Sequence, residues 1–316
     1  MRQIRDGWMS AVIRASRAAG LLVVPLRTLR TERMDSPGID AGLMQWLLER
    51  VRSGASPEAV LAAMVERGWD GDAAAATLES AMREHLAEHA REHGLPAPER
   101  VPCPVEMNGA SVIDAGDRRV TVLANMLHPR VVVFGGVLAD DECDALVAMG
   151  RERLRPSPVL DMETGVDAVH ASRTSDGMFF RRGENALCER IERRLAALVD
   201  WPIENGEGLQ LLRYGPGAEY RPHYDYFDPA RPGAAKTLAR GGQRVASIVM
   251  YLNTPERGGA TTFPDARFEV AAVKGNAVFF AYDRPHPMTG SLHAGAPVVA
   301  GEKWVATKWL RVGRYD

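Results

Sequence analysis

Three residues in the C-terminal third of the chain have the types and spacing of a metal site. His223 and Asp225 are two positions apart in a segment of extended character, and His293 follows later. Side chains at positions i and i+2 of a strand point to the same face, so the imidazole and the carboxylate are expected to converge. Two neutral imidazoles and one carboxylate bind non-haem Fe(II) and leave coordination positions open. A His-x-Asp pair alone is weak evidence, because it also occurs by chance on surface loops.

A lysine beyond the third ligand supports the metal-site interpretation. Lys303 begins an apolar, strand-like run that continues to Arg311. A buried ammonium group needs an anionic partner to keep its charge, and a dicarboxylic co-substrate would supply one. The alternative is an exposed lysine at a strand start, which is the usual environment of lysine. The apolar neighbours of Lys303 favour the buried position.

Several segments around these residues resemble a known enzyme family. The chain is similar, in family order, to the catalytic core of the prolyl 4-hydroxylase group of Fe(II)/2-oxoglutarate dioxygenases. The similar segments are 209–217, 220–227, 241–247, 250–253, 258–264, 291–298 and 301–304. The resemblance implies a jelly-roll catalytic domain, a double-stranded β-helix with flanking helices. A small N-terminal helical bundle would complete an α+β protein.

The resemblance also implies roles for individual residues. Fe(II) would bind His223, Asp225 and His293, and 2-oxoglutarate would chelate the iron while dioxygen takes the last position. The far carboxylate of 2-oxoglutarate would pair with Lys303. Other co-substrate contacts are expected from Tyr214, Thr261 and Trp309. Strand alternation turns only one of two adjacent threonines inward, and the resemblance favours Thr261 over its neighbour. Tyr214 and Trp309 are alternatively plain core aromatics. Ascorbate is the implied reductant.

Substrate contacts follow from the resemblance alone. The positions that meet a peptide correspond to Ser175, Glu207, Tyr220 and Arg244. Arg244 and Glu207 are alternatively a structural ion pair. The leading hypothesis is a procollagen-proline 4-dioxygenase-like enzyme that hydroxylates prolyl residues in a peptide or protein. The second hypothesis is a dioxygenase acting on a free amino acid or another small molecule. A third is a non-catalytic scaffold acting through the N-terminal bundle, which the intact ligand set makes less favoured.

Composition sets the outer limits of these hypotheses. The chain has 316 residues, is 46% hydrophobic and carries a formal net charge of -2. This is enough for a large domain and a smaller one, and it does not indicate a nucleic-acid partner. The three cysteines are scattered without the spacing of a disulfide or metal framework, which predicts reduced thiols and a cytoplasmic location. The sequence contains no apolar run long enough to span a bilayer.

The N-terminal part has three predicted regions. Residues 1–35 form a basic leader, interpreted either as disordered or as an arm for a membrane surface or nucleic acid; a further alternative is translation from Met34. Residues 36–95 have helical periodicity and predict a three-helix domain. It resembles ubiquitin-associated modules over a short stretch and would serve as a protein-recruitment module or as a brace. Residues 96–106 form a proline-rich linker, and residues 107–316 form the dioxygenase domain.

Short strands separated by glycine and proline follow in the catalytic region. The pattern predicts strands over residues 209–214, 245–252, 268–273, 277–282 and 304–312. This punctuation is typical of an antiparallel sandwich or jelly roll. Two amphipathic helices are expected before these strands, one beginning near Asp140 and one over residues 184–199. They would pack on the outside of the sheets.

Overall fold

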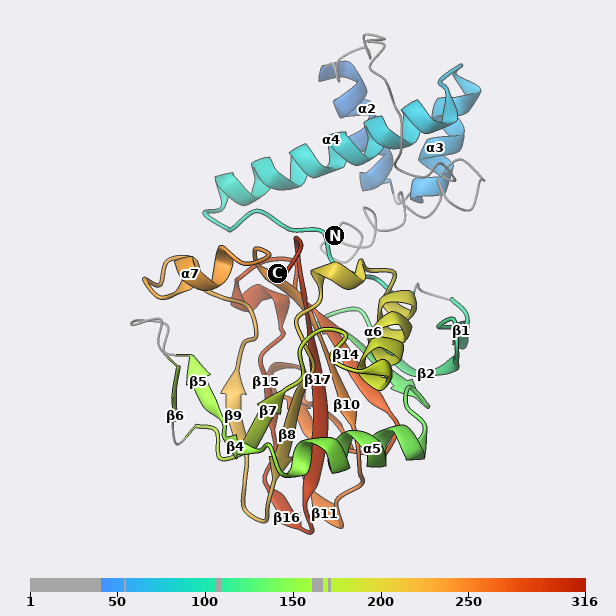
Figure 1. Ribbon diagram of the computed structural model, residues 1–316. Helices are drawn as coiled ribbons and strands as arrows, with labels where there is room; N and C mark the ends of the chain where they lie inside the picture. The colour runs from blue at the N-terminus through green and yellow to red at the C-terminus, as the bar shows by residue number, and fades with distance from the viewer. Residues whose placement is uncertain (1–40, 54, 106–108, 161–166, 170–171) are drawn as a thin grey trace. The chain divides into compact units, whose positions relative to one another are not determined.

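The protein consists of two compact units, residues 1–98 and 99–316, which are described separately. The computed structural model describes residues 41–53, 55–105, 109–160, 167–169 and 172–316 (Figure 1). The predicted basic leader, residues 1–35, lies outside the described residues. Among the helices of the described ranges, none combines the length and the apolar content needed to cross a membrane.

The described residues of the first unit form three helices, α2 (Ala41–Arg52), α3 (Pro57–Glu66) and α4 (Gly71–Glu92). The Ser56 side chain accepts a hydrogen bond from the Ala59 backbone N–H at 3.2 Å, and proline occupies the first turn of α3. This is the expected geometry for a Ser-Pro helix start. The buried core is small and rich in alanine: Leu47, Val60, Leu61, Met64, Ala74, Ala75, Leu78 and Ala81.

Residues 99–105, which the sequence places in a linker, belong to the second unit and bond to its other residues. The Glu99 backbone N–H donates to the Asp283 carbonyl at 2.6 Å. The Val105 side chain is buried in the larger core, and its carbonyl accepts a hydrogen bond from Arg130. Prolines leave an extended chain with few internal hydrogen bonds, so this segment bonds to its neighbours instead. The predicted domain start at residue 107 stays a prediction.

The second unit is built on a nine-stranded antiparallel sheet. Its order is β1-β2-β3-β14-β10-β17-β8-β7-β4. The strands are β1 (Val112–Asp114), β2 (Arg119–Met126), β3 (Arg130–Gly135), β4 (Arg155–Pro156), β7 (Asp176–Phe179), β8 (Gln210–Tyr214), β10 (Arg244–Tyr251), β14 (Ala277–Ala281) and β17 (Lys303–Arg311). The predicted strands that fall in this sheet agree with it to within one or two residues.

A smaller sheet faces the first and carries two of the candidate metal ligands. Its order is β13-β12-β15-β9, with strands β9 (Tyr220–His223), β12 (Thr261–Phe263), β13 (Phe268–Val270) and β15 (His293–Gly295). Two further antiparallel pairs are β11 (Arg257–Gly258) with β16 (Val298–Ala300), and β5 (Pro158–Leu160) with β6 (Asp167–Val169). The extensive antiparallel pairing of two facing sheets is consistent with a jelly roll.

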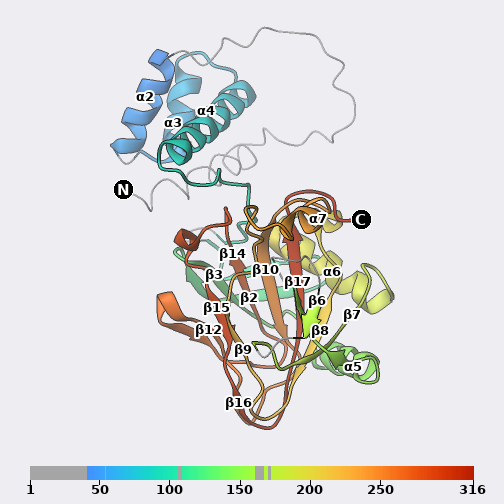
Figure 2. The same ribbon diagram turned by 90° about the vertical axis from the view of Figure 1, so that its left-hand side faces the viewer.

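The two faces of the large sheet are buried by different partners. One face packs on α5 (Asp140–Arg151) and α6 (Ala186–Val199), and this core includes Leu146, Leu195 and Trp304. The other face packs on the small sheet through Tyr251, Phe263 and Phe280. Figure 2 shows α5 and α6 on one side of β10 and β17 and strands β12 and β15 on the other. Because side chains alternate along a strand, each central strand serves both cores.

The helices on the outer face lie where the sequence predicts them, α5 beginning at Asp140 and α6 two residues later than predicted. The Asn185 side chain caps α6 by accepting from the Cys188 backbone N–H at 2.9 Å. Three acidic residues occupy the first turn of α5, where the helix dipole favours negative charge. The remaining helical segments are short: α7 (Ala234–Leu238), η1 (Ile203–Asn205), η2 (Pro264–Ala266) and η3 (Pro287–Thr289). The outer helices stiffen the large sheet from the side opposite the candidate ligands.

Candidate active site

The two candidate histidine ligands lie on neighbouring strands of the small sheet. His223 ends β9 and His293 begins β15, and the register places them directly opposite each other. Their ring centroids are 4.2 Å apart. Asp225 does not lie in the strand: β9 ends at His223, and the carboxylate follows in a bend. The predicted convergence therefore occurs, but the bend rather than strand alternation produces it.

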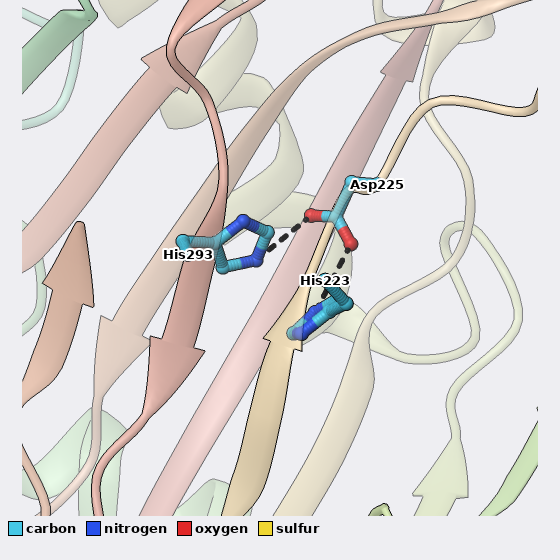
Figure 3. Close-up of side chains that lie close together, drawn as sticks. All are labelled: His223, Asp225 and His293. Atoms are coloured by element: carbon cyan, nitrogen blue, oxygen red, sulfur yellow. Dashed lines mark ion pairs between the residues drawn. The ribbon is translucent and has the colours of Figure 1, made fainter. Parts of the chain in front are cut away.

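The three ligand groups converge on one point (Figure 3). His223 Nε2 lies 3.6 Å from Asp225 Oδ1, and His293 Nε2 lies 3.6 Å from Asp225 Oδ2. One ligand atom from each residue lies within 4.8 Å of the other two. Two imidazole nitrogens and one carboxylate oxygen so arranged fit a divalent transition metal of the non-haem iron type.

Backbone carbonyl groups fix the orientation of both imidazoles. His223 Nδ1 lies 2.8 Å from the Arg221 carbonyl oxygen, and His293 Nδ1 lies 3.0 Å from the Ser291 carbonyl oxygen. A carbonyl only accepts, so each Nδ1 carries the proton and each Nε2 keeps its lone pair for a metal. Burial, helped by the neighbouring His293, lowers the pKa of His223 to about 3. The His223 ring is therefore in its neutral, metal-binding form near neutral pH.

Asp225 is held as a carboxylate despite its burial. Burial works against ionisation, but the imidazoles of His293 and His223 and the charge of Arg244 outweigh it, so the pKa of Asp225 lies below its usual range. The Ser247 hydroxyl on β10 also donates to Asp225 Oδ2 at 2.6 Å. Ser247 was not among the predicted site residues. Its signal was a polar residue inside an otherwise apolar strand, which is unusual unless the residue bonds to something.

Lys303 is a buried cation at the beginning of β17. Only 3% of its surface is exposed, and its register partner is Tyr214 on β8. Within the residues that the structure describes, no carboxylate lies within ion-pair distance of its Nζ atom. The nearest ring centroids are those of Tyr214 at 5.5 Å and Tyr251 at 5.8 Å. Burial lowers the pKa of Lys303 to about 8. A buried ammonium group without a protein anion fits the far carboxylate of 2-oxoglutarate.

A threonine is hydrogen-bonded to Tyr251, one of the two tyrosines whose rings lie near this lysine. Thr261 on β12 is buried and Thr262 is half-buried, so the inward residue is the predicted one. The Tyr251 hydroxyl donates to Thr261 Oγ1 at 2.8 Å. The sequence analysis did not identify Tyr251 as a site residue, although it lies in one of the family-like segments. Tyr251 and Ser247 are four positions apart on β10 and so share its inner face.

Trp309 shares the inner face of β17 with Lys303 by strand alternation. Its ring packs against the Arg244 guanidinium, whose central carbon is 3.8 Å from the ring centroid. The indole N–H is buried, and it has no hydrogen-bond partner among the described residues. These contacts place Trp309 in the same interior as the ligands, and its predicted role as a wall of the co-substrate pocket stays a prediction.

The residues predicted to contact a substrate have different surroundings. Tyr220 stacks on the His223 ring with centroids 3.5 Å apart. Ser175 is buried and bonds to the Ser157 hydroxyl at 3.1 Å. Glu207 accepts two hydrogen bonds from Arg244, at 2.7 and 2.9 Å. The ion pair that the sequence analysis gave as the alternative for these two residues is thus present in the structure.

The chain is similar to known proteins over the segment that contains this site. The sequence profile of the 2OG-Fe(II) oxygenase superfamily matches residues 209–311. Prolyl 4-hydroxylase 5 of Arabidopsis thaliana is 38% identical over 221 residues, which are 63% of this chain and 74% of that protein. Prolyl 4-hydroxylase 2 of the same plant is 38% identical over 211 residues, 60% of this chain and 69% of that protein.

A solved structure also aligns with the chain. It is the viral collagen prolyl hydroxylase of Paramecium Bursaria Chlorella virus-1 in complex with 2-oxoglutarate, with 30% sequence identity and a TM-score of 0.45. The alignment covers 57% of this chain and 95% of that one. The similarity to these sequence relatives, together with the ligand triad, shows that the chain belongs to the prolyl 4-hydroxylase family. It is a 2-oxoglutarate-dependent dioxygenase that uses Fe(II), 2-oxoglutarate and dioxygen.

Proposed function

We propose that this enzyme hydroxylates prolyl residues within a peptide or protein. The observation that carries the proposal is a complete ligand triad in a chain that is 38% identical to a plant prolyl 4-hydroxylase. Tyr220 supports a peptide substrate, because its half-buried ring lies on His223 at the edge of the metal site. Aromatic faces of this kind pack well against proline rings.

The protein groups have separable tasks in this reaction. His223, Asp225 and His293 would hold the iron, and Lys303 would bind the far carboxylate of 2-oxoglutarate with hydroxyl groups from Thr261 and Tyr214 nearby. When bound, iron and 2-oxoglutarate supply the oxidising chemistry that converts a substrate C–H group into C–OH as the co-substrate becomes succinate. The chain itself positions the reacting groups and excludes water from the site.

Aromatic side chains shield the metal ligand His293 from water. The Phe280 ring centroid lies 4.4 Å from that of His293, and the Phe263 centroid lies 6.2 Å from it. Both phenylalanines are fully buried between the two sheets. A dry environment strengthens the electrostatic attraction between Lys303 and a carboxylate.

The N-terminal unit has a separate proposed role. Its helices present a small core of their own, and the family profile does not extend to it. It would recruit a protein partner or the substrate, or else act as a brace. Deletion of residues 1–98 distinguishes these roles, because recruitment affects only long substrates, whereas a brace affects the stability of the catalytic unit.

The proposal is tested by measuring succinate formation with Fe(II) and a panel of proline-containing peptides. Peptides are then examined by mass spectrometry for one added oxygen. The wild type is compared with His223→Ala, and His128→Ala is the matched control because His128 is exposed and outside the site. We expect peptide-stimulated turnover and oxygen on proline in the wild type and the control, and neither in His223→Ala. Iron-dependent turnover indifferent to every peptide would redirect the search to small-molecule substrates.

A further inference from the structure

A chain of two buried hydroxyl groups ends on the carboxylate of Asp225. The Ser247 hydroxyl donates to Asp225 Oδ2 at 2.6 Å, and the Tyr282 hydroxyl lies 2.9 Å from Ser247 Oγ. Ser247 is fully buried and Tyr282 is 2% exposed. Ser247 lies on β10 and Tyr282 directly follows β14, its neighbour in the large sheet. A residue of the large sheet thus bonds to Asp225, although Asp225 itself lies in the segment after β9.

The direction of these hydrogen bonds follows from the number of protons. An ionised carboxylate only accepts, so the single proton of the Ser247 hydroxyl goes to Asp225. The Ser247 oxygen must then accept from Tyr282. Burial raises the pKa of Tyr282 well above its usual range, so its hydroxyl keeps the proton that it donates. Tyr282 therefore donates to Ser247, and Ser247 donates to Asp225 Oδ2. Each hydroxyl has a single proton, so neither hydrogen bond can run in the opposite direction.

The two oxygens of Asp225 are therefore not equivalent. Oδ2 accepts a short hydrogen bond from Ser247, whereas the described residues provide no hydrogen-bond donor to Oδ1. Oδ1 lies 3.6 Å from His223 Nε2 and Oδ2 lies 3.6 Å from His293 Nε2, so the hydrogen bond and not the distance to an imidazole distinguishes the two oxygens. A carboxylate oxygen that already accepts a short bond has less electron density and less freedom to turn toward a cation.

We propose that Ser247, held in place by Tyr282, is a positioning residue that reserves Asp225 Oδ1 as the single metal-binding oxygen. A carboxylate that bound through both oxygens would occupy one more coordination position. The co-substrate and dioxygen would need the open positions that two histidines and one carboxylate oxygen leave on the metal. The inference deepens the proposed function, because it concerns the metal centre that prolyl hydroxylation needs.

The proposal is tested by metal binding without any peptide. Mn(II) affinity is measured for the wild type, Ser247→Ala, Ser247→Thr and Tyr282→Phe. The visible charge-transfer band of the Fe(II)–2-oxoglutarate complex is recorded without oxygen at saturating iron. Ser157→Ala is the matched control, since it also deletes a buried hydroxyl but one that bonds to Ser175. Circular dichroism and thermal unfolding confirm that each variant is folded.

We expect Ser247→Ala to bind Mn(II) about 10- to 100-fold more weakly, the usual effect of losing such an outer partner. Its charge-transfer band should be weaker even at saturating iron, because fewer positions remain for the co-substrate. Ser247→Thr keeps the donor and should restore both properties, and Ser157→Ala should match the wild type. Tyr282→Phe should lose a few-fold in affinity, since Ser247 remains but is less firmly oriented.

Wild-type Mn(II) affinity together with a full band in Ser247→Ala would overturn the proposal. So would an equal loss of affinity in Ser157→Ala, because the effect would then be a general one of core hydroxyls. If Ser247→Ala does not fold, Tyr282→Phe decides, and unchanged binding there counts against the proposal. None of these measurements involves a peptide, so a wrong assignment of the prolyl substrate leaves the result intact.

Discussion

Two lysines on strand β17 are buried to the same extent and have opposite surroundings. Lys308 faces the outer helices, and its Nζ lies 2.6 Å from Glu192 Oε1 on α6. Lys303 faces the metal site, and the described part of the chain gives it no carboxylate partner. Their exposed fractions are 1% and 3%. Burial lowers the pKa of both lysines, but for Lys308 the charge of Glu192 opposes that effect.

The difference separates a structural charge from a functional one. The charge of Lys308 is compensated within the fold, so its ion pair holds α6 against the sheet. The charge of Lys303 is not compensated until an anion binds, so the fold keeps a desolvated cation for a ligand. Buried charge alone therefore does not identify a functional lysine. The lack of a carboxylate partner among the described residues is what distinguishes Lys303 from Lys308.

The largest effect is expected from removing the partner of Lys308. Glu192→Gln leaves a buried ammonium group without its carboxylate and should reduce the free energy of unfolding by about 3 to 5 kcal/mol. Denaturant unfolding measures the loss. The double variant Glu192→Gln with Lys308→Met removes both charges and should recover most of the stability. A loss below about 1 kcal/mol in the single variant would contradict a structural role for the pair.

The matching change at the other lysine should weaken co-substrate binding without destabilising the fold. Lys303→Met removes the cation for the far carboxylate and should weaken 2-oxoglutarate binding by about 3 kcal/mol, or roughly 100-fold. Because the ligand-free protein loses an uncompensated charge, its free energy of unfolding at neutral pH should rise. Titration calorimetry and denaturant unfolding check the two effects. Lys308→Met is the control, and it should lose stability while folded molecules still bind 2-oxoglutarate.

Lys303 also predicts an alkaline pH dependence. Its pKa is about 8 in the fold and 10.5 as the ordinary value, so between these pH values the unfolded chain binds more protons at this position. The unfolding free energy of the ligand-free protein should therefore rise with pH across this window, by at most about 3 kcal/mol. The difference between wild type and Lys303→Met isolates this contribution. A flat difference from pH 8 to 10.5 would contradict it.

The affinity for 2-oxoglutarate should change in the opposite direction over the same range. The dianion binds the protonated lysine, so affinity should fall as pH rises through about 8. In Lys303→Met the remaining weak binding should not show this fall.

The smallest effect is expected from removing the hydroxyl group of Tyr251, whose ring lies near Lys303. Tyr251→Phe removes the hydrogen bond to Thr261 and should weaken 2-oxoglutarate binding by about 1 kcal/mol, or roughly fivefold. Tyr315→Phe is the control, because Tyr315 packs between Arg240 and Arg311 and away from the ligands. Equal 2-oxoglutarate affinity in both variants would remove Tyr251 from the co-substrate site.

Sequence patterns predicted much of the sheet architecture. The strands over residues 245–252 and 277–282 were predicted closely because apolar β-formers are bounded there by glycine and proline. The inward choice of Thr261 and the shared face of Lys303 and Trp309 also followed from alternation along one strand. These are local properties, and each depends on residues that are close in the sequence.

The convergence of the site could not be predicted in the same way. His293 meets His223 because β15 pairs with β9 in one particular register, between segments that are far apart in the chain. The predicted strand geometry for Asp225 was wrong, since β9 ends before it and a bend turns the carboxylate inward. Ser247 lies on β10 and Tyr282 directly after β14, and the two have no common spacing that a sequence pattern could show.

The sequence by itself determined the ligand types, the family and the approximate strands, because side-chain chemistry and alternation are encoded locally. Only the tertiary structure decided which buried charges are paired. Lys303 and Lys308 have the same side chain and lie on the same strand. They differ only in the residues that the layer packed against each face of the sheet brings next to them. Glu192 reaches Lys308 because α6 packs on the outer face, whereas the inner face leaves Lys303 for a ligand. That assignment depends on contacts between distant segments, which residue order alone does not fix.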